Sequence, residues 1–344
     1  MIYFNTDFVN GMHPLILKKL EETNEEQLPN YGTDFHTHNA QELIKKACNC
    51  DCDVHLLVGG TQANVTILSH MLRPYQGVIT AATGHINVHE TGALEATGHK
   101  NLVVPSVSGK ISAKAVEDYY ASHFGMADPS HEIQPKAVYI SNSTELGTIY
   151  TKKELEELSA ICKKLNLYFM MDGARLGYAL GCKNNDITLE DLAQLLDVFY
   201  LGGTKLGTMF GEAVIITNSE IKEFFRYSIK QNGGMLAKGR FLGIQFEILM
   251  QDDLYLNLGK HAAYQSEKLQ DLFKELNIST LFPSPSNQQF PIFPNSVLGE
   301  LEKKYVFEKT RVIDDAHTCV RICTSWATKD EDLDMLINDI KSLY

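Results

Sequence analysis

Lys205 ends the run VFYLGGTK (198–205), after an apolar segment and a glycine pair. A lysine in this place is expected to point into a pocket more often than a random surface lysine does. Burial and neighbouring cations lower the pKa of a lysine and leave the neutral amine, which attacks aldehydes. Taken alone, the residue is more often an ordinary surface lysine, so the hypothesis of a reactive amine depends on its neighbours.

Asp172 ends another apolar run, in the sequence YFMMDGAR (168–175). A carboxylate in such a place is costly unless it has a partner. An aspartate that faces a pyridine nitrogen would keep this nitrogen protonated and make the ring a better electron sink. An aspartate that caps the following turn is the alternative. Arg175 could bind a substrate carboxylate through its guanidinium fork, or pair with a neighbouring acid.

The segment GGTQAN (59–64) joins an apolar run to a helical pattern. Glycine lets the backbone approach a phosphate, and free N–H groups at a helix start donate to it. Gly60, Thr61 and Gln62 are therefore candidates for phosphate binding, as is the hydroxyl of Thr204. A glycine turn with a threonine N-cap is an equal alternative. The segment matches neither the dinucleotide fingerprint nor the P-loop, so nucleotide binding has little support.

The composition narrows the class of protein. With 344 residues, the chain is long enough for two packed units. Its net charge of −12 argues against binding to nucleic acid or to anionic membranes. We find no signal peptide and no apolar run long enough to span a membrane. Cys48, Cys50 and Cys52 lack the C-x-x-C spacing of zinc sites, so we expect no metal, and reduced thiols in a cytoplasmic protein.

Short apolar runs alternate with helical patterns through the first two-thirds of the chain. This alternation predicts an α/β fold with a mostly parallel sheet covered on both faces. In such sheets ligands bind at the carboxyl ends of the strands. The expected strands are 54–58, 77–82, 137–141, 167–171, 198–201 and 213–217, and the expected helices are 63–72 and 152–165.

The last third has a different pattern. Helical patterns at 238–250, 256–276 and 331–343, with a strand-like run at 319–323, predict a smaller α+β domain. We therefore expect an N-terminal arm and a large domain in residues 1–245, and a small C-terminal domain in residues 246–344.

These motifs follow one another in an order that resembles a known class of enzymes. A phosphate-binding segment, a strand-end aspartate and a strand-end lysine about 30 residues later are typical of pyridoxal 5′-phosphate (PLP) enzymes of fold type I, the aspartate-aminotransferase-like fold. More specifically, the chain resembles the threonine aldolase and β-eliminating lyase family over essentially its whole length. The matching segments are YG (31–32), GGTQAN (59–64), H-x-x-x-x-E (85–90), DGARLG (172–177), GGTKLG (202–207) and VRICTSWAT (320–328).

The resemblance implies roles for the residues that match. Lys205 would carry PLP as a Schiff base, and Asp172 would hold the pyridine nitrogen. His85 would stack on the cofactor ring and take part in proton transfer; a histidine that is merely hydrogen-bonded within an apolar run is the alternative. Glu90 would orient local donors, or else lie on a helix surface.

The resemblance also implies a substrate site. Arg175 and Arg321 would hold the carboxylate of an amino-acid substrate. Arg321 lies in a strand-like run, where an unpaired guanidinium would be costly, and a structural salt bridge is its alternative role. Thr6 loosely matches an N-terminal position that supplies a substrate-binding hydroxyl.

Family members assemble as dimers or pairs of dimers with sites at the subunit interface, so a homodimer or homotetramer is expected. Lys230 and Lys238 lie in a region from which relatives send a basic side chain to a neighbouring subunit's cofactor phosphate. On single-sequence grounds, both are more often solvated lysines.

One residue departs from the family pattern. Threonine aldolases usually carry a histidine in the loop after the strand at 137–141, where it meets the β-hydroxyl of the substrate, and this chain has Glu145 there. A carboxylate can still accept that proton if its surroundings raise its pKa. The difference leaves the exact substrate, and the aldol reaction itself, open.

The implied reaction is cleavage of a β-hydroxy-α-amino acid, threonine or allo-threonine, to glycine and an aldehyde, with His85 or Glu145 as the base. Alternatives on the same scaffold are β-elimination and transamination of another amino acid. A non-catalytic PLP-binding protein is an alternative of another class, and a dinucleotide-dependent dehydrogenase is a remote one.

Overall fold

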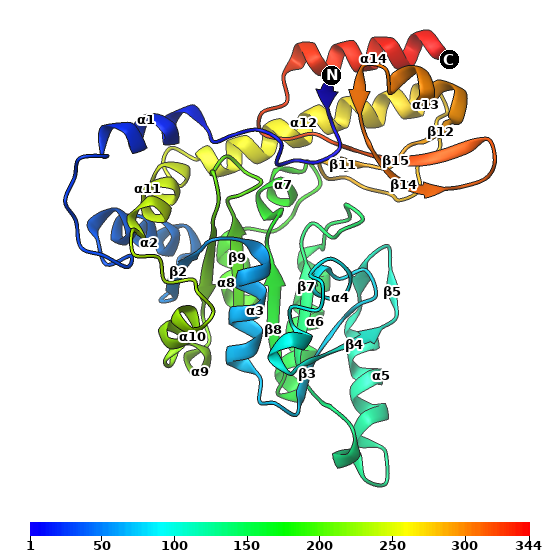
Figure 1. Ribbon diagram of the computed structural model, residues 1–344. Helices are drawn as coiled ribbons and strands as arrows, with labels where there is room; N and C mark the ends of the chain where they lie inside the picture. Colours follow the sequence, from blue (N-terminus) through cyan, green and yellow to red (C-terminus); the bar gives the residue numbers. More distant parts are fainter.

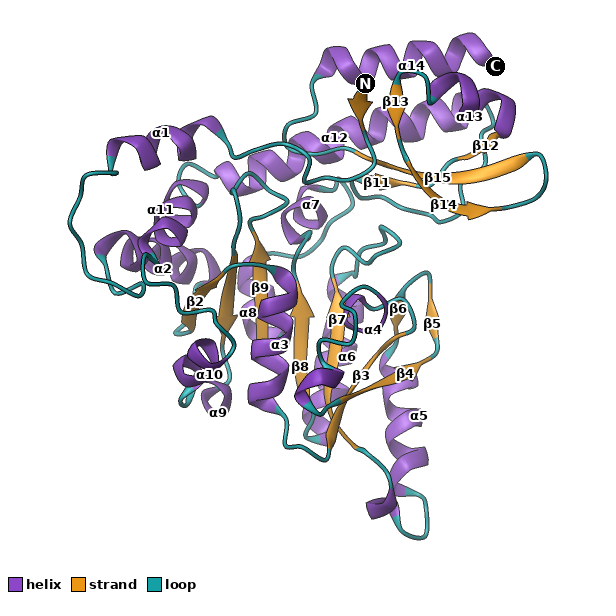
Figure 2. Ribbon diagram, in the orientation of Figure 1, coloured by secondary structure: helices purple, strands orange, loops and turns teal.

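The computed structural model describes all 344 residues, and a seven-stranded sheet forms its centre (Figures 1 and 2). The strand order is β2-β10-β9-β8-β7-β3-β4, and every neighbouring pair is parallel except the two that β10 makes. The strands are β2 (Asp53–Leu57), β3 (Gln76–Ala81), β4 (Lys100–Val104), β7 (Gln134–Ser141), β8 (Tyr168–Asp172), β9 (Val198–Gly202) and β10 (Glu212–Ile216). This is the mostly parallel α/β sheet that the sequence predicts.

Helices cover both faces of this sheet because alternate strand residues are apolar on both sides. Val138, Phe169 and Phe199 pack in one cluster with the first set of helices, whereas Ala137 and Met170 pack in another with the second set. The first set is α2 (Phe35–Cys48), α5 (Ala113–Phe124), α6 (Lys152–Leu165), α8 (Leu189–Leu195) and α11 (Arg240–Leu249); the second is α3 (Gly60–Met71), α4 (His85–Val88), α9 (Ser219–Lys222) and α10 (Phe225–Gln231).

A second, smaller sheet lies near the chain termini (Figure 1). Its strands β11 (Gln288–Gln289), β12 (Ile292–Pro294) and β14 (Glu308–Val312) all pair with β15 (His317–Cys323). Helices α12 (Leu254–Glu275), α13 (Asn295–Leu301) and α14 (Asp330–Leu343) share its apolar core. The result is a small α+β unit packed above the carboxyl ends of the large sheet.

The remaining elements are short. The N-terminal strand β1 (Ile2–Tyr3) pairs with β13 (Tyr305–Val306) of the small unit, and α1 (Pro14–Glu22) packs against α11. A hairpin of β5 (Ser106–Val107) and β6 (Lys110–Ile111) extends from β4, and α7 (Leu176–Gly181) follows β8. The predicted boundary at residue 245 lies inside α11, and the division into domains stays a proposal.

Two further observations concern the cysteines and the helices. All seven cysteines are free, Cys48 and Cys52 are buried, and burial raises the pKa of Cys52 to about 12. Such thiols stay protonated at neutral pH. None of the helices combines the length and the apolar character needed to cross a membrane.

Candidate active site

The expected site residues gather where the parallel strands end. Asp172 is the last residue of β8, Lys205 follows β9, His85 opens α4 after β3, and Gly60 opens α3 after β2. The carboxyl ends of parallel strands meet at one edge of a sheet, where ligands of such folds bind. The motifs are thus brought to one edge by the topology.

Asp172 is buried and accepts three hydrogen bonds from the protein. Its Oδ2 accepts from Asn64 Nδ2 at 3.0 Å and from the Tyr139 hydroxyl at 2.5 Å, and its Oδ1 accepts from the backbone of Ala174 at 3.0 Å. Burial alone would raise the pKa of Asp172, but the charge of His85 and these donors bring it below its ordinary value. The carboxylate therefore keeps its negative charge in the interior.

His85 lies beside this carboxylate and is held by Glu90. His85 Nδ1 is 2.7 Å from Glu90 Oε1, which also accepts from Asn64 at 2.8 Å. Burial lowers the pKa of His85, but the bond to Glu90 and the charge of Asp172 outweigh it, so the net pKa is raised. Ligand atoms of His85, Glu90 and Asp172 lie within 4.8 Å of one another, a set that could also bind a metal ion. The Asn64 amide bridges the two carboxylates and links the set as one hydrogen-bonded network.

Lys205 is positioned through its backbone. The Tyr178 hydroxyl donates to the Lys205 carbonyl, and Lys205 Nζ lies 5.9 Å from the centroid of the Phe8 ring. Burial, and then the charge of Arg175, lower the pKa of Lys205. A half-buried amine with a lowered pKa has the property expected of a nucleophile.

The start of α3 offers free donors. Its N-cap Gly59 has no side-chain cap, and the N–H groups of Gly60, Thr61 and Gln62 have no partner in the protein. The Gln62 side chain is engaged elsewhere, since its Oε1 accepts from Val58 N at 3.1 Å and its Nε2 donates to Asn232 O at 3.0 Å. These three residues could therefore bind an anion through backbone N–H groups.

Arg175 is paired inside the protein. Its Nε and Nη2 donate to Asp7 at 2.7 and 3.0 Å, and Asn287 donates to the same carboxylate at 2.9 Å. Burial would raise the pKa of Asp7, but Arg175 and the charge of Lys205 lower it to about 2. The second interpretation of Arg175, a pair with a neighbouring acid, thus describes this structure, and Nη1 and the second N–H of Nη2 remain for a substrate.

Arg321 is only partly satisfied. Its Nη2 donates to Glu308 and, at 3.2 Å, to the carbonyl of Asn5, while its Nε is buried without a partner. The Glu308 side chain is 47% exposed, so this ion pair can exchange partners more easily than the buried one at Arg175. Thr6 lies between Asn5 and Asp7 in the chain, and these neighbours place it near both arginines.

Glu145 lies beside His85. Its Oε1 accepts from the backbone N–H of His85 at 3.0 Å and from the Ser141 hydroxyl at 2.7 Å, and its Oε2 has no partner in the protein. Burial and the charge of Asp172 raise the pKa of Glu145 against these bonds. A carboxylate with one free oxygen and a raised pKa is suited to proton transfer.

Comparisons with known proteins identify the family of the chain. A family profile described as "Beta-eliminating lyase" matches residues 6–293. The chain belongs to the β-eliminating lyase family. It is 30% identical to a low-specificity L-threonine aldolase of Pseudomonas sp. (strain NCIMB 10558) over 99% of this chain and 97% of that protein.

Solved structures of similar proteins have the same fold. A structure of Leishmania major threonine aldolase is 43% identical, with a TM-score of 0.97 over 100% of this chain and 99% of that chain. A Thermus thermophilus aspartate aminotransferase mutant matches with a TM-score of 0.71 at 13% identity, over 100% of this chain and 92% of that chain. The fold of this lyase is therefore fold type I, and its cofactor is PLP.

The residues of the lyase fit PLP. The free N–H groups at α3 suit a phosphate, the ionised Asp172 suits a protonated pyridine nitrogen, and Lys205 supplies an amine. The Tyr200 hydroxyl is also buried without a partner, and a Cβ added to Gly60 would lie 3.2 Å from it. A larger residue at Gly60 would crowd this corner.

Thr204 is engaged within the lyase. Its hydroxyl donates to Glu212 Oε1 at 2.8 Å and accepts from Gly211 N at 3.0 Å. Its predicted contact with the phosphate stays a prediction. Lys230 and Lys238 are both exposed, and Lys230 Nζ lies 5.2 Å from the centroid of the Tyr31 ring, within the YG segment.

Two of these residues, Asp7 and Glu212, were not identified from the sequence. Asp7 lies 168 positions from the arginine it pairs with, and Glu212 begins an apolar strand outside the quoted motifs. A carboxylate at the edge of an apolar strand was the signal that identified Asp172, and it applies to Glu212 as well.

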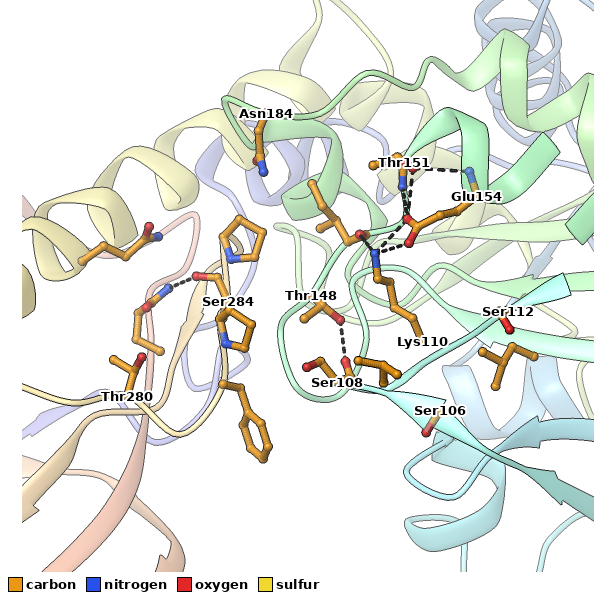
Figure 3. A pocket seen from close by; sticks show the side chains of 18 of the residues that line it. Ser106, Ser108, Lys110, Ser112, Thr148, Thr151, Glu154, Asn184, Thr280 and Ser284 are labelled. Carbon is orange, nitrogen blue, oxygen red and sulfur yellow. Dashed lines mark hydrogen bonds and ion pairs between the residues drawn. The ribbon is translucent and has the colours of Figure 1, made fainter. Parts of the chain in front are cut away.

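A large groove lies apart from this site. It has a volume of about 1290 Å³ and runs between the β5–β6 hairpin and the small unit (Figure 3). There Lys110 Nζ lies 2.6 Å from Glu154 Oε1, which neutralises both charges. None of the candidate active-site residues lines it. The loop after β7 links the two places, because it carries Glu145 to the site and Thr148 to the groove.

Proposed function

We propose that the protein cleaves a β-hydroxy-α-amino acid, threonine or allo-threonine, to glycine and an aldehyde. The observation that carries this proposal is the full-length match to the Leishmania threonine aldolase, at 43% identity and a TM-score of 0.97. The lysine, the buried aspartate and the histidine at the strand ends support it, because they are the groups that such chemistry needs.

Each of the catalytic residues has a separate role in this reaction. Lys205 would hold the cofactor through its amine. PLP, when bound, supplies a sink for the electron pair released as the Cα–Cβ bond breaks. Asp172 would hold the pyridine nitrogen through its negative charge, and His85 would stack on the ring.

The arginines and an acid handle the substrate. Arg321, with its unpaired Nε, and Arg175, through Nη1, hold the substrate carboxylate, and Thr6 adds a hydroxyl nearby. Glu145 accepts the β-hydroxyl proton at its free Oε2, with His85 as the second candidate base. Thr204 and the N–H groups of α3 serve the phosphate end.

The test is a product assay of the PLP-loaded protein with threonine, allo-threonine, serine and cysteine. We expect acetaldehyde and glycine from threonine or allo-threonine, and no turnover by Lys205→Ala. Pyruvate and ammonia from serine or cysteine would instead support β-elimination, and turnover that needs a keto acid would support transamination. A protein that stays colourless with PLP would contradict all of these functions.

We further propose a cytoplasmic homodimer or homotetramer with sites completed at the interface. The exposed apolar side chains Phe8, Tyr31 and Met209 support an interface there, because Phe8 adjoins Lys205, Met209 lies four residues after it, and Tyr31 adjoins Lys230. Light scattering gives the subunit number. Mixing Lys205→Ala with a Lys230→Ala variant tests the shared site, because mixed assemblies should regain activity only if subunits complete each other.

A further inference from the structure

Glu212 is placed among the catalytic strand ends by the one antiparallel strand. β10 runs opposite to its neighbours β9 and β2, so its first residue lies where theirs end. In the register, Glu212 is opposite Gly202 on one side and Leu57 on the other. Gly202 lies three positions before Lys205, so an acid stands directly behind the lysine loop.

The carboxyl of Glu212 is buried and only half satisfied. The residue is 2% exposed, its Oε1 accepts from the Thr204 hydroxyl at 2.8 Å, and its Oε2 is buried without any partner. An ionised carboxylate with a bare oxygen costs far more in such a place than a neutral carboxyl does. The surroundings therefore favour a carboxyl that keeps its proton.

Glu212 does not act as a direct counter-charge of Lys205. Neither residue belongs to any of the ion pairs of the chain, so Lys205 Nζ has no carboxylate within 4.0 Å. The hydrogen-bonded route from the carboxyl to the lysine runs through Thr204, the neighbour of Lys205 in the chain. On the other side, the Tyr178 hydroxyl holds the Lys205 carbonyl.

The loop has no room to relax around this contact. A Cβ added to Gly203 would lie 2.8 Å from the carbonyl of Gly211, from the Phe246 ring and from the Thr208 side chain. Gly203 N also donates to the Gly211 carbonyl at 2.9 Å. The hydrogen bond from Thr204 to Glu212 is thus part of a tightly packed turn.

We propose that Glu212 is a positioning residue for Lys205, a buried carboxyl that stays uncharged at neutral pH and fixes the lysine through Thr204. This inference rests on the proposed function, because it takes Lys205 as the residue to which PLP is attached. It adds a residue outside every segment that matches the family pattern.

The electrostatics agree with this geometry. Burial raises the pKa of Glu212 to about 8 against the opposing effects of Thr204, Lys205 and the backbone of Gly203. Asp172 adds to the rise. The hydroxyls of Tyr200 and Tyr255, the other ionisable groups that face Glu212, are neutral, since burial raises the pKa of both.

The first test measures PLP affinity and the visible absorbance of the PLP-loaded protein. Glu212→Leu and Thr204→Val should each weaken PLP binding roughly tenfold, equivalent to about 1.4 kcal/mol. The double variant should lose no more than Thr204→Val alone, because both substitutions break the same contact. Glu212→Gln keeps an acceptor for Thr204 and should retain the affinity and the absorbance pH profile of the wild type.

The second test needs no cofactor and follows the melting temperature of the PLP-free chain against pH. The pKa of Glu212 is raised on folding from its ordinary value of 4.5 to about 8. The folded state should therefore become less stable as the pH rises from 4.5 to about 8. Gln does not titrate, so the melting temperature of Glu212→Gln should rise relative to wild type across this window. A constant difference would mean that Glu212 is already ionised, and would overturn the inference.

The two proposals fail in different ways. If wild-type protein binds no PLP at Lys205, as shown by borohydride trapping, the proposed function fails. If PLP is trapped at Lys205 but Glu212→Leu binds it as tightly as wild type, or if Glu212→Gln shifts the absorbance pH profile, the positioning role fails and the function stands.

Discussion

Glu145 shows how one residue can take two parts in a site. One carboxylate oxygen is occupied by the backbone of His85 and by Ser141, so it fixes the start of α4. The other oxygen is free. A residue that only positioned His85 would work equally well as an amide, whereas a base requires the carboxylate.

The substitution Glu145→Gln distinguishes the positioning role of Glu145 from its role as a base. We expect kcat to fall roughly 10²- to 10⁴-fold, the usual contribution of a general base. Burial raises the pKa of Glu145, so the wild-type rate should fall as the pH drops through this raised pKa. The variant should lose this pH dependence. Ser141→Ala is the matched control, because it removes one hydrogen bond and leaves the carboxylate. An unchanged pH profile in Glu145→Gln would assign the proton transfer to His85.

Asp7 gives a prediction about stability. Asp7→Asn leaves the buried guanidinium of Arg175 without its charged partner, which typically costs about 3–5 kcal/mol. The pKa of Asp7 is lowered from 3.8 to about 2, so this contribution is present above pH 3.8 and disappears as pH falls through 2.

Urea unfolding of wild type and Asp7→Asn measures this difference. The gap in unfolding free energy should be full at pH 5 and should narrow steadily below pH 4. Glu308→Gln, which removes the exposed partner of Arg321, is the control and should change stability by less than about 1 kcal/mol. Equal stability of Asp7→Asn and wild type at neutral pH would contradict the account.

At the scale of elements, the sequence predicts most accurately the helix and strand bounds that nearby residues determine. The helix predicted at 152–165 has these bounds because Thr151 and Glu154 form a capping box and Asn166 ends the helix in a left-handed conformation. Strands were placed within about three residues of their observed ends. Helices α2 and α5 and strand β4 are not among the predicted elements, although Asp34 and Ser112 cap the two helices through side-chain hydrogen bonds.

The same limit applies to the site. The motifs place Lys205, Asp172 and His85 correctly at strand ends, because each follows its own strand in the chain. The partners of these groups come from distant positions: Tyr139 lies 33 residues from Asp172. A single sequence records no contact of this kind, so the pairing of Asp7 with Arg175 and of Glu212 with Thr204 is known only from the fold.

The ends of β8 and β9 are held close by glycines, which gives a prediction for these elements. A Cβ on Gly173 would lie 1.7 Å from the carbonyl oxygen of Tyr200. Gly173→Ala must therefore push β9 away from β8 and separate Asp172 from Lys205. We expect a large loss of stability and of PLP binding, measured by thermal melting and by visible absorbance. Gly299→Ala has open space around its Cβ and should behave as wild type.

At the scale of the whole molecule, the N-terminal arm joins the two units. Phe4 N donates to the Val306 carbonyl at 2.9 Å, and Phe4 O accepts from Cys323 N at 2.7 Å, both in the small unit. His13 N donates to Gly207 O at 2.7 Å in the large unit. The arm therefore contacts both units. Arg175 of the large unit and Arg321 of the small unit would bind the same substrate carboxylate.

Removing residues 1–5 tests this arrangement. The truncation deletes β1 and the carbonyl that Arg321 contacts but leaves Asp7, so Lys205 and its surroundings should keep their PLP absorbance. We expect KM for the amino acid to rise roughly tenfold or more with a smaller change in kcat, because Arg321 loses its fixed position relative to Arg175. Tyr3→Ala is the control, since its side chain is 55% exposed and the backbone pairing of β1 remains. If KM stayed at the wild-type value, the other contacts between the two units would be enough to keep them in register, and the arm would serve stability rather than substrate binding.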